Sequence, residues 1–249
     1  MQQRVAALVA VLMVAVAVGT FAQTQAQQTQ QADRAGLGRD RGPAQTVIGP
    51  TGSVVTPTAE VIGDRRVQLG YHAFRLDRGR VDFSVPEISV AAGPCWEFSG
   101  AYFDVGGHPG QGARHYWPIM DEQAFVWGFK LKLLAEHKNS PAVALGVWDA
   151  GDAIDLSAYA VATKHLFPHF VVPVKVSAGV ASGDEVFSDF FGSIVFQPRD
   201  WLDWVVEHDG HKLNMVWRFY PWEHLLVEGG WQDLMDSQWI GGASWYWDY

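Results

Sequence analysis

The most constraining feature of this sequence is a strict alternation of side-chain types that recurs from residue 67 to the end of the chain. In the stretch 125–134, large apolar residues alternate with residues that are mostly small or charged. Because successive side chains of a β-strand point to opposite faces, this period predicts strands with two different faces. The same contrast recurs at 67–73, 142–147, 172–179 and 212–219, and no helical period of useful length accompanies it.

Turn-forming residues separate these alternating runs. Gly, Pro, Asn and Asp supply the backbone angles that a chain reversal needs, and they cluster at 92–94, 106–107, 139–141, 150–152, 182–184 and 209–210. Counting the runs between these breaks predicts about twelve strands of roughly 8–12 residues, with ten as the alternative count. Regular hairpins at this spacing favour an antiparallel, up-and-down sheet.

The two predicted faces distinguish a transmembrane barrel from a soluble sandwich. One face is large and apolar, as lipid requires. The other is rich in Gly, Ala and Ser, which suit a narrow lumen, and it also carries Lys130, Lys132, Lys175, Glu207, Arg218 and Glu228. In hydrocarbon every backbone polar group must be paired internally, so the sheet must close on itself. We therefore predict an all-β, antiparallel transmembrane β-barrel with an even number of strands and both termini in the periplasm.

Aromatic residues support a membrane location. The chain contains 12 Trp, 7 Tyr and 14 Phe. Trp and Tyr favour membrane–water interfaces, and we assign such positions to Trp127, Trp217, Trp245, Trp247 and Tyr249. The last residue is aromatic, with aromatics two and four positions earlier, which resembles the terminal-strand signal read by the barrel-assembly machinery. The alternative is that these aromatics build an ordinary β core or a sugar-binding surface.

The N-terminal region has the pattern of an exported protein. Arg4 precedes an apolar run at 5–18 and the small-residue stretch ending at Ala22, so residues 1–22 are predicted to be a signal peptide. The run is shorter than the roughly 20 residues of a membrane-spanning helix, although an uncleaved anchor is the alternative. No cysteine near Ala22 marks a lipid attachment site. Residues 23–48 are interpreted as a disordered Gln-rich linker, and 49–249 as the barrel.

Charge and cysteine content exclude nucleic-acid binding and a disulfide within the chain. The net charge is −9, so the chain lacks the cationic excess that binds nucleic acid. Cys95 is the single cysteine, which rules out a disulfide within the chain.

The sequence contains no strong catalytic or metal-binding motif. We find no nucleophile elbow, Walker loop or Rossmann glycine pattern. His208 and His211 lie across a tight turn and should diverge, while Asp149, Asp152 and Asp155 lack the distal Glu of a calcium loop. We therefore expect no enzyme activity, metal or cofactor. The alternative is a lipid-modifying site that pairs a serine with a histidine, and its candidates are Ser157, Ser177, Ser188, His208 and His224.

The charged residues of the inner face are expected to form a network in the lumen. Glu207 and Arg218 lie on strands joined by the turn at Asp209 and Gly210, so we expect them to pair across the hairpin. Together with Lys130, Lys132, Lys175 and Glu228 they would either select ions or anionic glycans or obstruct and stiffen the barrel.

Several segments resemble the YjbH-like family of outer-membrane β-barrel proteins associated with exopolysaccharide or capsule loci. They are the entry segment 49–59, the hairpin 141–149, the strand 159–164 and the turn 207–210 followed by Asn214. The chain is shorter than the family pattern and has no lipobox cysteine. The resemblance implies a barrel fold, a location in the outer membrane of a Gram-negative-type bacterium, and polysaccharide as a possible partner.

The sequence thus predicts a non-enzymatic outer-membrane β-barrel, either structural or a narrow conduit linked to exopolysaccharide export or surface assembly. Its expected partners are outer-membrane lipid and, during biogenesis, the barrel-assembly machinery. Two alternatives stay open: a soluble periplasmic β-protein that binds carbohydrate, and an outer-membrane lipid-modifying enzyme.

Overall fold

The computed structural model describes residues 43–76, 81–107, 123–166, 171–183, 186, 188–234 and 238–249. The predicted signal peptide and residues 23–42 of the predicted linker lie outside this part of the chain. Within the described ranges, no helix is long and apolar enough to cross a bilayer.

The regular structure consists of twelve β-strands. They are β1 (Arg66–Leu76), β2 (Val81–Ala91), β3 (Trp96–Gly107), β4 (Ala124–Leu134), β5 (Ala142–Trp148), β6 (Ser157–Leu166), β7 (Val174–Ser182), β8 (Ser188–Arg199), β9 (Leu202–His208), β10 (Leu213–Trp222), β11 (Leu225–Gln232) and β12 (Gln238–Asp248).

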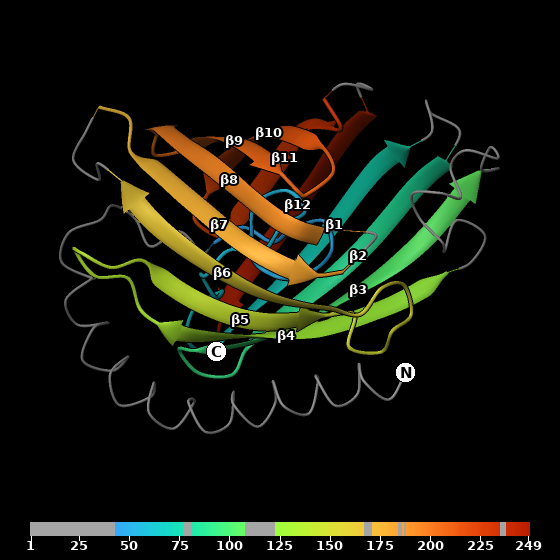
Figure 1. Ribbon diagram of the computed structural model, residues 1–249. Coiled ribbons are helices and arrows are strands. Elements are labelled where there is room, and N and C mark those ends of the chain that lie inside the picture. The colour runs from blue at the N-terminus through green and yellow to red at the C-terminus, as the bar shows by residue number, and fades with distance from the viewer. Residues whose placement is uncertain are drawn as a thin grey trace.

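The twelve strands form one closed barrel (Figure 1). Each strand pairs with its neighbours in the sequence, and β1 pairs antiparallel with β12 from Arg66 opposite Asp248 to Phe74 opposite Ile240. This last pairing removes both free edges, so the backbone groups of the terminal strands are satisfied within the sheet. The predicted fold class, a closed antiparallel barrel of about twelve strands, is confirmed.

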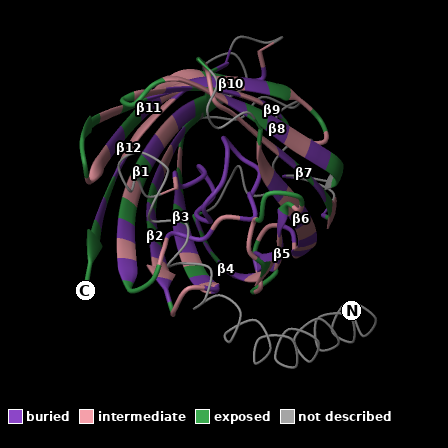
Figure 2. Ribbon diagram, turned by 90° about the vertical axis from the view of Figure 1, so that its left-hand side faces the viewer, coloured by how far each residue is buried: buried purple, intermediate pink, exposed green. Residues whose placement is uncertain are grey.

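Burial alternates along the strands, as Figure 2 shows. On β4, Phe125 and Trp127 are exposed while Ala124 and Val126 are buried. Leu131 departs from this pattern because a small cluster at the end of the strand, formed with Cys95, Trp96 and Leu133, covers it. The exposed face remains strongly apolar, as a lipid-facing surface requires, and includes Leu69, Ile88, Phe98, Val180, Phe190, Ile194, Val227 and Trp239.

The inner face is more apolar than predicted. Small residues do occur where space demands them: a Cβ at Gly179 would lie 2.3 Å from the ring of Phe191. The sequence pattern predicts small and ionised side chains inside the barrel, yet Phe74, Phe83 and Trp148 are also buried. Phe74 and Phe83 stack with their ring centroids 4.7 Å apart. These rings belong to a core shared with a segment that fills the barrel.

That segment comprises residues 43–63, here called the plug. Residues 44–59 are all buried, and the segment runs inside the barrel in both Figure 1 and Figure 2. The barrel strands therefore begin at Arg66 and not at residue 49, and residues 43–48, predicted as linker, lie inside the barrel. The physical reason is that the plug carries apolar side chains that join the core, namely Val47, Ile48, Val54, Val55 and Ala59.

Candidate functional site: the plugged lumen

Glu207 of β9 holds the tip of the plug through backbone N–H groups. Its carboxylate accepts hydrogen bonds from the amides of Val54 (2.8 Å), Val55 (2.9 Å) and Thr56 (3.0 Å). It also accepts one from the Thr56 hydroxyl at 2.7 Å and one from the Asn214 amide at 3.0 Å. A carboxylate that accepts several N–H bonds is a strong acceptor, so this contact fixes the turn at the tip.

Glu97 of β3 joins the middle of the plug, at Thr51, to its C-terminal end, at Ile62. It accepts hydrogen bonds from the Thr51 amide (2.7 Å), the Thr51 hydroxyl (2.6 Å) and the Ile62 amide (3.0 Å). Lys130 of β4 lies 3.5 Å from Glu97 and donates to the Thr51 carbonyl at 2.8 Å and to the Thr51 hydroxyl. The Glu97–Lys130 ion pair of the wall therefore binds Thr51 of the plug through both of its charged groups.

Arg218 of β10 binds the plug through carbonyl groups. Its guanidinium donates to the carbonyls of Gly52 (3.3 Å) and Ser53, and to the Glu228 carboxylate at 2.7 Å. Glu228 is in turn 2.9 Å from His72, whose other ring nitrogen is 3.0 Å from Glu87. The wall thus carries a buried chain of ionisable groups that ends on the plug backbone.

Hydroxyl and ring N–H groups complete the contacts between wall and plug. The Ser53 and Ser193 hydroxyl oxygens are 2.5 Å apart, and the Ala59 amide donates to Thr163 at 2.9 Å. The Ile48 carbonyl accepts from the Trp148 indole at 3.1 Å. These bonds supply partners for the main chain of a segment that has no strand ladder of its own, apart from isolated bridges.

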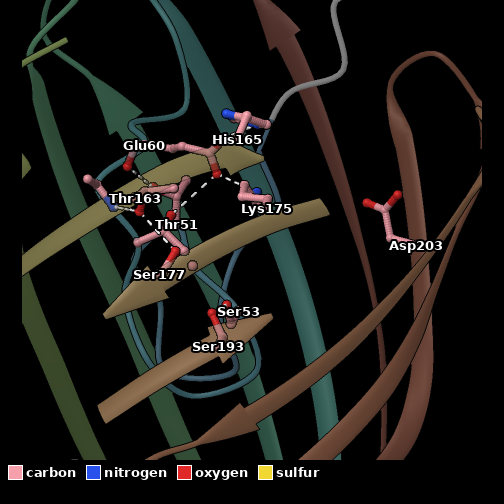
Figure 3. A network of polar contacts seen from close by, with 12 residues as sticks. Thr51, Ser53, Glu60, Thr163, His165, Lys175, Ser177, Ser193 and Asp203 are labelled. Atoms are coloured by element: carbon pink, nitrogen blue, oxygen red, sulfur yellow. Dashed lines mark hydrogen bonds and ion pairs between the residues drawn. The ribbon is translucent and has the colours of Figure 1, made fainter. Parts of the chain in front are cut away.

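Glu60 forms the charged end of the plug. Its carboxylate lies 2.6 Å from the Lys175 ammonium of β7 and 3.9 Å from His165 of β6 (Figure 3). His165 itself lies 2.7 Å from Glu136. Burial raises the pKa of Glu60, but the attraction of Lys175 and then of His165 outweighs it and lowers this pKa to about 2. Glu60 is therefore an anion at physiological pH.

The plug tip is bound close to the turn between β9 and β10. β1 and β12 bring the N-terminal start of the barrel and the C-terminus to one end, and in an up-and-down barrel β9 also starts there. Glu207 is the penultimate residue of β9, so it lies toward the opposite end. The plug tip, bound to Glu207, therefore lies beside the turn between β9 and β10.

The structure brings most of the predicted lumen charges onto the plug. Lys130, Lys175, Glu207 and Arg218 contact it directly, and Glu228 contacts it through Arg218. The Lys132 ammonium makes no hydrogen bond or ion pair within the described residues.

The expected pair between Glu207 and Arg218 does not form. In the hairpin register, Glu207 lies opposite Asn214 and Arg218 lies opposite Asp203. The two side chains are thus four residues apart along β10, and Arg218 pairs instead with Glu228 of the next strand.

The predicted interface aromatics lie on the outer side of the barrel. Trp127, Trp245, Trp247 and Tyr249 are exposed, and Trp217 is half-buried at a T-shaped contact with Trp231, with centroids 5.7 Å apart. Tyr246, between two of these residues, points inward and is buried.

The candidate serines and histidines are not brought together. Ser157 bonds to Asp155 and Ser177 to Thr163, while His208 is exposed beside its own turn and His224 packs against Trp245 and Tyr246 at the opposite end of the barrel. The side chain of Ser188 lies outside the described residues. Among the described side chains, no group of three or more His, Cys, Asp or Glu could hold a metal ion.

Sequence reasoning missed several residues of the site, namely His72, Glu87, Glu97 and Glu60. A signal was present for Glu97, which stands between Trp96 and Phe98 in an alternating run and therefore had to face inward. Glu60 had no such signal, because the plug does not alternate.

Comparisons with known proteins add little to this geometry. No family model matches the chain, and no curated protein does. Among solved structures, the chain is similar to outer membrane phospholipase A from Escherichia coli, with a TM-score of 0.33 and 8% identity over 75% of this chain and 90% of that one. A likeness at this level carries no argument about activity, and the fold rests on the strand pairing described above. The resemblance to the YjbH-like family stays a prediction.

Proposed function

We propose that this chain is an outer-membrane β-barrel of a Gram-negative-type bacterium and that its lumen is a narrow conduit closed by the plug. The observation that carries the proposal is the way the plug is held. Glu97, Glu207 and Arg218 bind its main chain, and the plug adds no strand to the barrel.

The plug can leave without breaking the barrel. Strands β1 and β12 pair with each other directly, so the ladder is closed whether or not residues 43–63 are inside. At the junction with β1, Gly63, the last residue of the plug, has a φ of 115°, and Arg65 has a φ of 49°. Such left-handed angles mark a sharp change of direction at the point where a displaced plug would pivot.

A reversible crosslink tests the proposal. In a Cys95→Ala background, Ser53→Cys and Ser193→Cys replace two hydroxyl groups that are 2.5 Å apart, within reach of a disulfide. We expect the purified chain in planar bilayers to show openings when reduced and none when oxidised. The single variant Ser53→Cys is the control, since its openings should not respond to oxidant.

Two results would contradict the proposal. Recovery of the protein from the soluble periplasm, without the heat-modifiable gel migration of a membrane barrel, would exclude the outer membrane. Absence of conductance in both redox states would leave a purely structural barrel.

The proposed cargo class rests on the sequence resemblance alone. Segments 49–59 and 207–210 resemble the YjbH-like family, which makes surface polysaccharide the cargo that we propose to test first. Swelling of proteoliposomes in oligosaccharide solutions measures its passage, with the oxidised crosslinked protein as the closed control. Equal swelling in both redox states would argue against polysaccharide.

A further inference from the structure

We infer that the open lumen prefers cations to anions and that Glu207 is the residue that sets this preference. The inference rests on the proposed conduit and names the class of solute that it favours.

Glu207 differs from the other carboxylates that hold the plug in place. Glu97 lies 3.5 Å from Lys130, Glu228 lies 2.7 Å from Arg218, and Glu60 lies 2.6 Å from Lys175. Glu207, in contrast, has no ion pair within the described residues, and all its donors are neutral groups.

The plug therefore supplies most of the hydrogen bonds that stabilise the buried carboxylate of Glu207. The Glu207 residue is 1% exposed, and four of the five hydrogen bonds to its carboxylate come from Val54, Val55 and Thr56. A buried charge without such bonds is costly. When the plug leaves, only the Asn214 amide remains, so the site requires water and a cation to replace the lost N–H groups.

The surroundings of Glu207 do not supply that cation. Asp209 shares the same Asn214 amide, at 3.0 Å, and adds a second negative charge. Lys212, in the adjacent turn, lies 3.2 Å from Asp233. Among the described residues next to Glu207, two carboxylates, Asp209 and Asp233, thus accompany one ammonium, Lys212.

Departure of the plug also releases one basic group, Lys175, which loses Glu60. Lys175 lies two residues along β7 from Ser177, and Ser177 pairs with Ser193, which pairs in turn with Glu207. The released ammonium therefore lies in the same part of the lumen as Glu207, where the carboxylates of Glu207 and Asp209 still outnumber it.

Gly52→Ala opens the lumen without changing its wall. A Cβ at Gly52 would lie 2.2 Å from the Thr56 carbonyl and 2.9 Å from the Cα of Pro57, both within the plug. Because these are backbone atoms, the plug turn must distort, and its fit to Glu207 is lost. Thr51→Val, which removes a hydroxyl that contacts Glu97 and Lys130, is a second opening variant in case Gly52→Ala does not fold.

The test measures reversal potentials in planar bilayers under a KCl gradient, using the full chain. We expect Gly52→Ala to have a permeability ratio of K⁺ to Cl⁻ above unity, and Gly52→Ala/Glu207→Gln to have a ratio that falls toward unity. The matched control is Gly52→Ala/Glu223→Gln, which neutralises an exposed carboxylate in the turn between β10 and β11 and should leave the ratio unchanged. Selectivity should weaken at high salt, because the Debye length falls from about 10 Å at 0.1 M to about 3 Å at 1 M.

The outcomes separate the inference from the proposed function. If both opening variants fold, as shown by heat-modifiable migration, and neither conducts, the conduit itself is wrong. If they conduct with no preference or favour Cl⁻, or if Glu207→Gln leaves the ratio unchanged, the conduit stands and the inference is overturned. If the inference holds, a polysaccharide cargo would have to be neutral or carry ammonium groups.

Discussion

At the scale of single residues, the lumen shows how buried charges are tolerated in a barrel. Lys130 is fully buried and has both Glu97 and Thr51 as partners, whereas Lys132, two residues further along β4, is half-buried without a partner within the described residues. A buried ion whose partner is removed is strongly destabilising, while a solvated charge contributes little. The two lysines are therefore a matched pair for measuring how firmly the plug is held.

We predict that Lys130→Met destabilises the folded barrel by about 3–5 kcal/mol, because it leaves Glu97 buried without its cation. Lys132→Met should change stability by less than about 1 kcal/mol. Urea unfolding in lipid vesicles, followed by the heat-modifiable band, measures both. Adding Glu97→Gln to Lys130→Met should recover part of the lost stability. Equal unfolding midpoints for the two single variants would show that the Glu97–Lys130 ion pair does not stabilise the barrel.

The second prediction at this scale concerns acid. The attraction of Lys175 and His165 overcomes the effect of burial and lowers the pKa of Glu60 from 4.5 to about 2. A lowered folded-state pKa gives stabilisation that is fully present above the unfolded value and is lost as the pH falls through the folded value. The difference in urea midpoint between the wild type and Glu60→Gln should be constant from pH 7 to about 5 and should shrink between about 4.5 and 2.

Glu223→Gln is the control for this experiment, because Glu223 is exposed in a turn outside the lumen. Its midpoint difference from the wild type should not follow the same course. A Glu60→Gln difference that is independent of pH down to about 2 would show that the contact with Lys175 does not stabilise the plug.

At the scale of the strand, each strand has one face toward the outside of the barrel and another toward its interior. Ile194 of β8 pairs with Val176 and Val206 and is 40% exposed, while its neighbour Val195 is buried. A one-residue shift in register would exchange these two faces. The outward-facing side chains must therefore be compatible with the medium around the barrel.

We predict that Ile194→Lys destabilises the barrel in lipid by about 2–4 kcal/mol, the cost of a lysine facing the bilayer midplane. His208→Lys, at the exposed end of β9, should cost at most about 1 kcal/mol. Thermal or urea unfolding in vesicles gives both values. If Ile194→Lys changes stability by no more than about 0.5 kcal/mol, as a water-facing substitution would, the membrane location is refuted.

The strands were predictable because alternation is a local property. The outward exposure of Phe125 and Trp127 follows directly from the sequence pattern of β4. The partner of Arg218 was not predictable, because it depends on a hairpin register in which Arg218 lies opposite Asp203 and next to Glu228. Register is a non-local result of closing the whole barrel, and a turn sequence alone does not fix it.

The plug was missed for a different physical reason. It has neither the period of a strand nor that of a helix, because its conformation is set by acceptors and donors on the wall such as Glu207 and Arg218. One signal was available in the sequence. Residues 44–59 contain no charged residue and carry four β-branched apolar residues, Val47, Ile48, Val54 and Val55. A charge-free, partly apolar segment is poorly suited to a solvated linker.

At the scale of the whole molecule, twelve strands place the start of β1 and the C-terminus at the same end of the barrel. The turns then divide into two sets. The turn between β4 and β5, at 135–141, lies at the end that holds the termini, and the turn between β9 and β10, at 209–212, lies at the opposite end. In a protein exported from the inner membrane, the first set would face the periplasm and the second the outside of the cell.

This arrangement predicts the accessibility of two turns in living cells. In a Cys95→Ala background, which removes the one buried thiol, His211→Cys and Lys138→Cys each place a cysteine at an exposed position in one of these turns. A membrane-impermeant maleimide should label His211→Cys in intact cells, and Lys138→Cys only after the outer membrane is permeabilised. The reverse pattern would mean that the barrel has the opposite orientation, and the plug would then enter from outside the cell. Labelling of neither variant until permeabilisation would mean that the chain does not cross the outer membrane. Since Glu207 lies near the end marked by His211, the expected pattern would also place the acidic end of the lumen toward the cell exterior, where cations arriving from outside would meet it first.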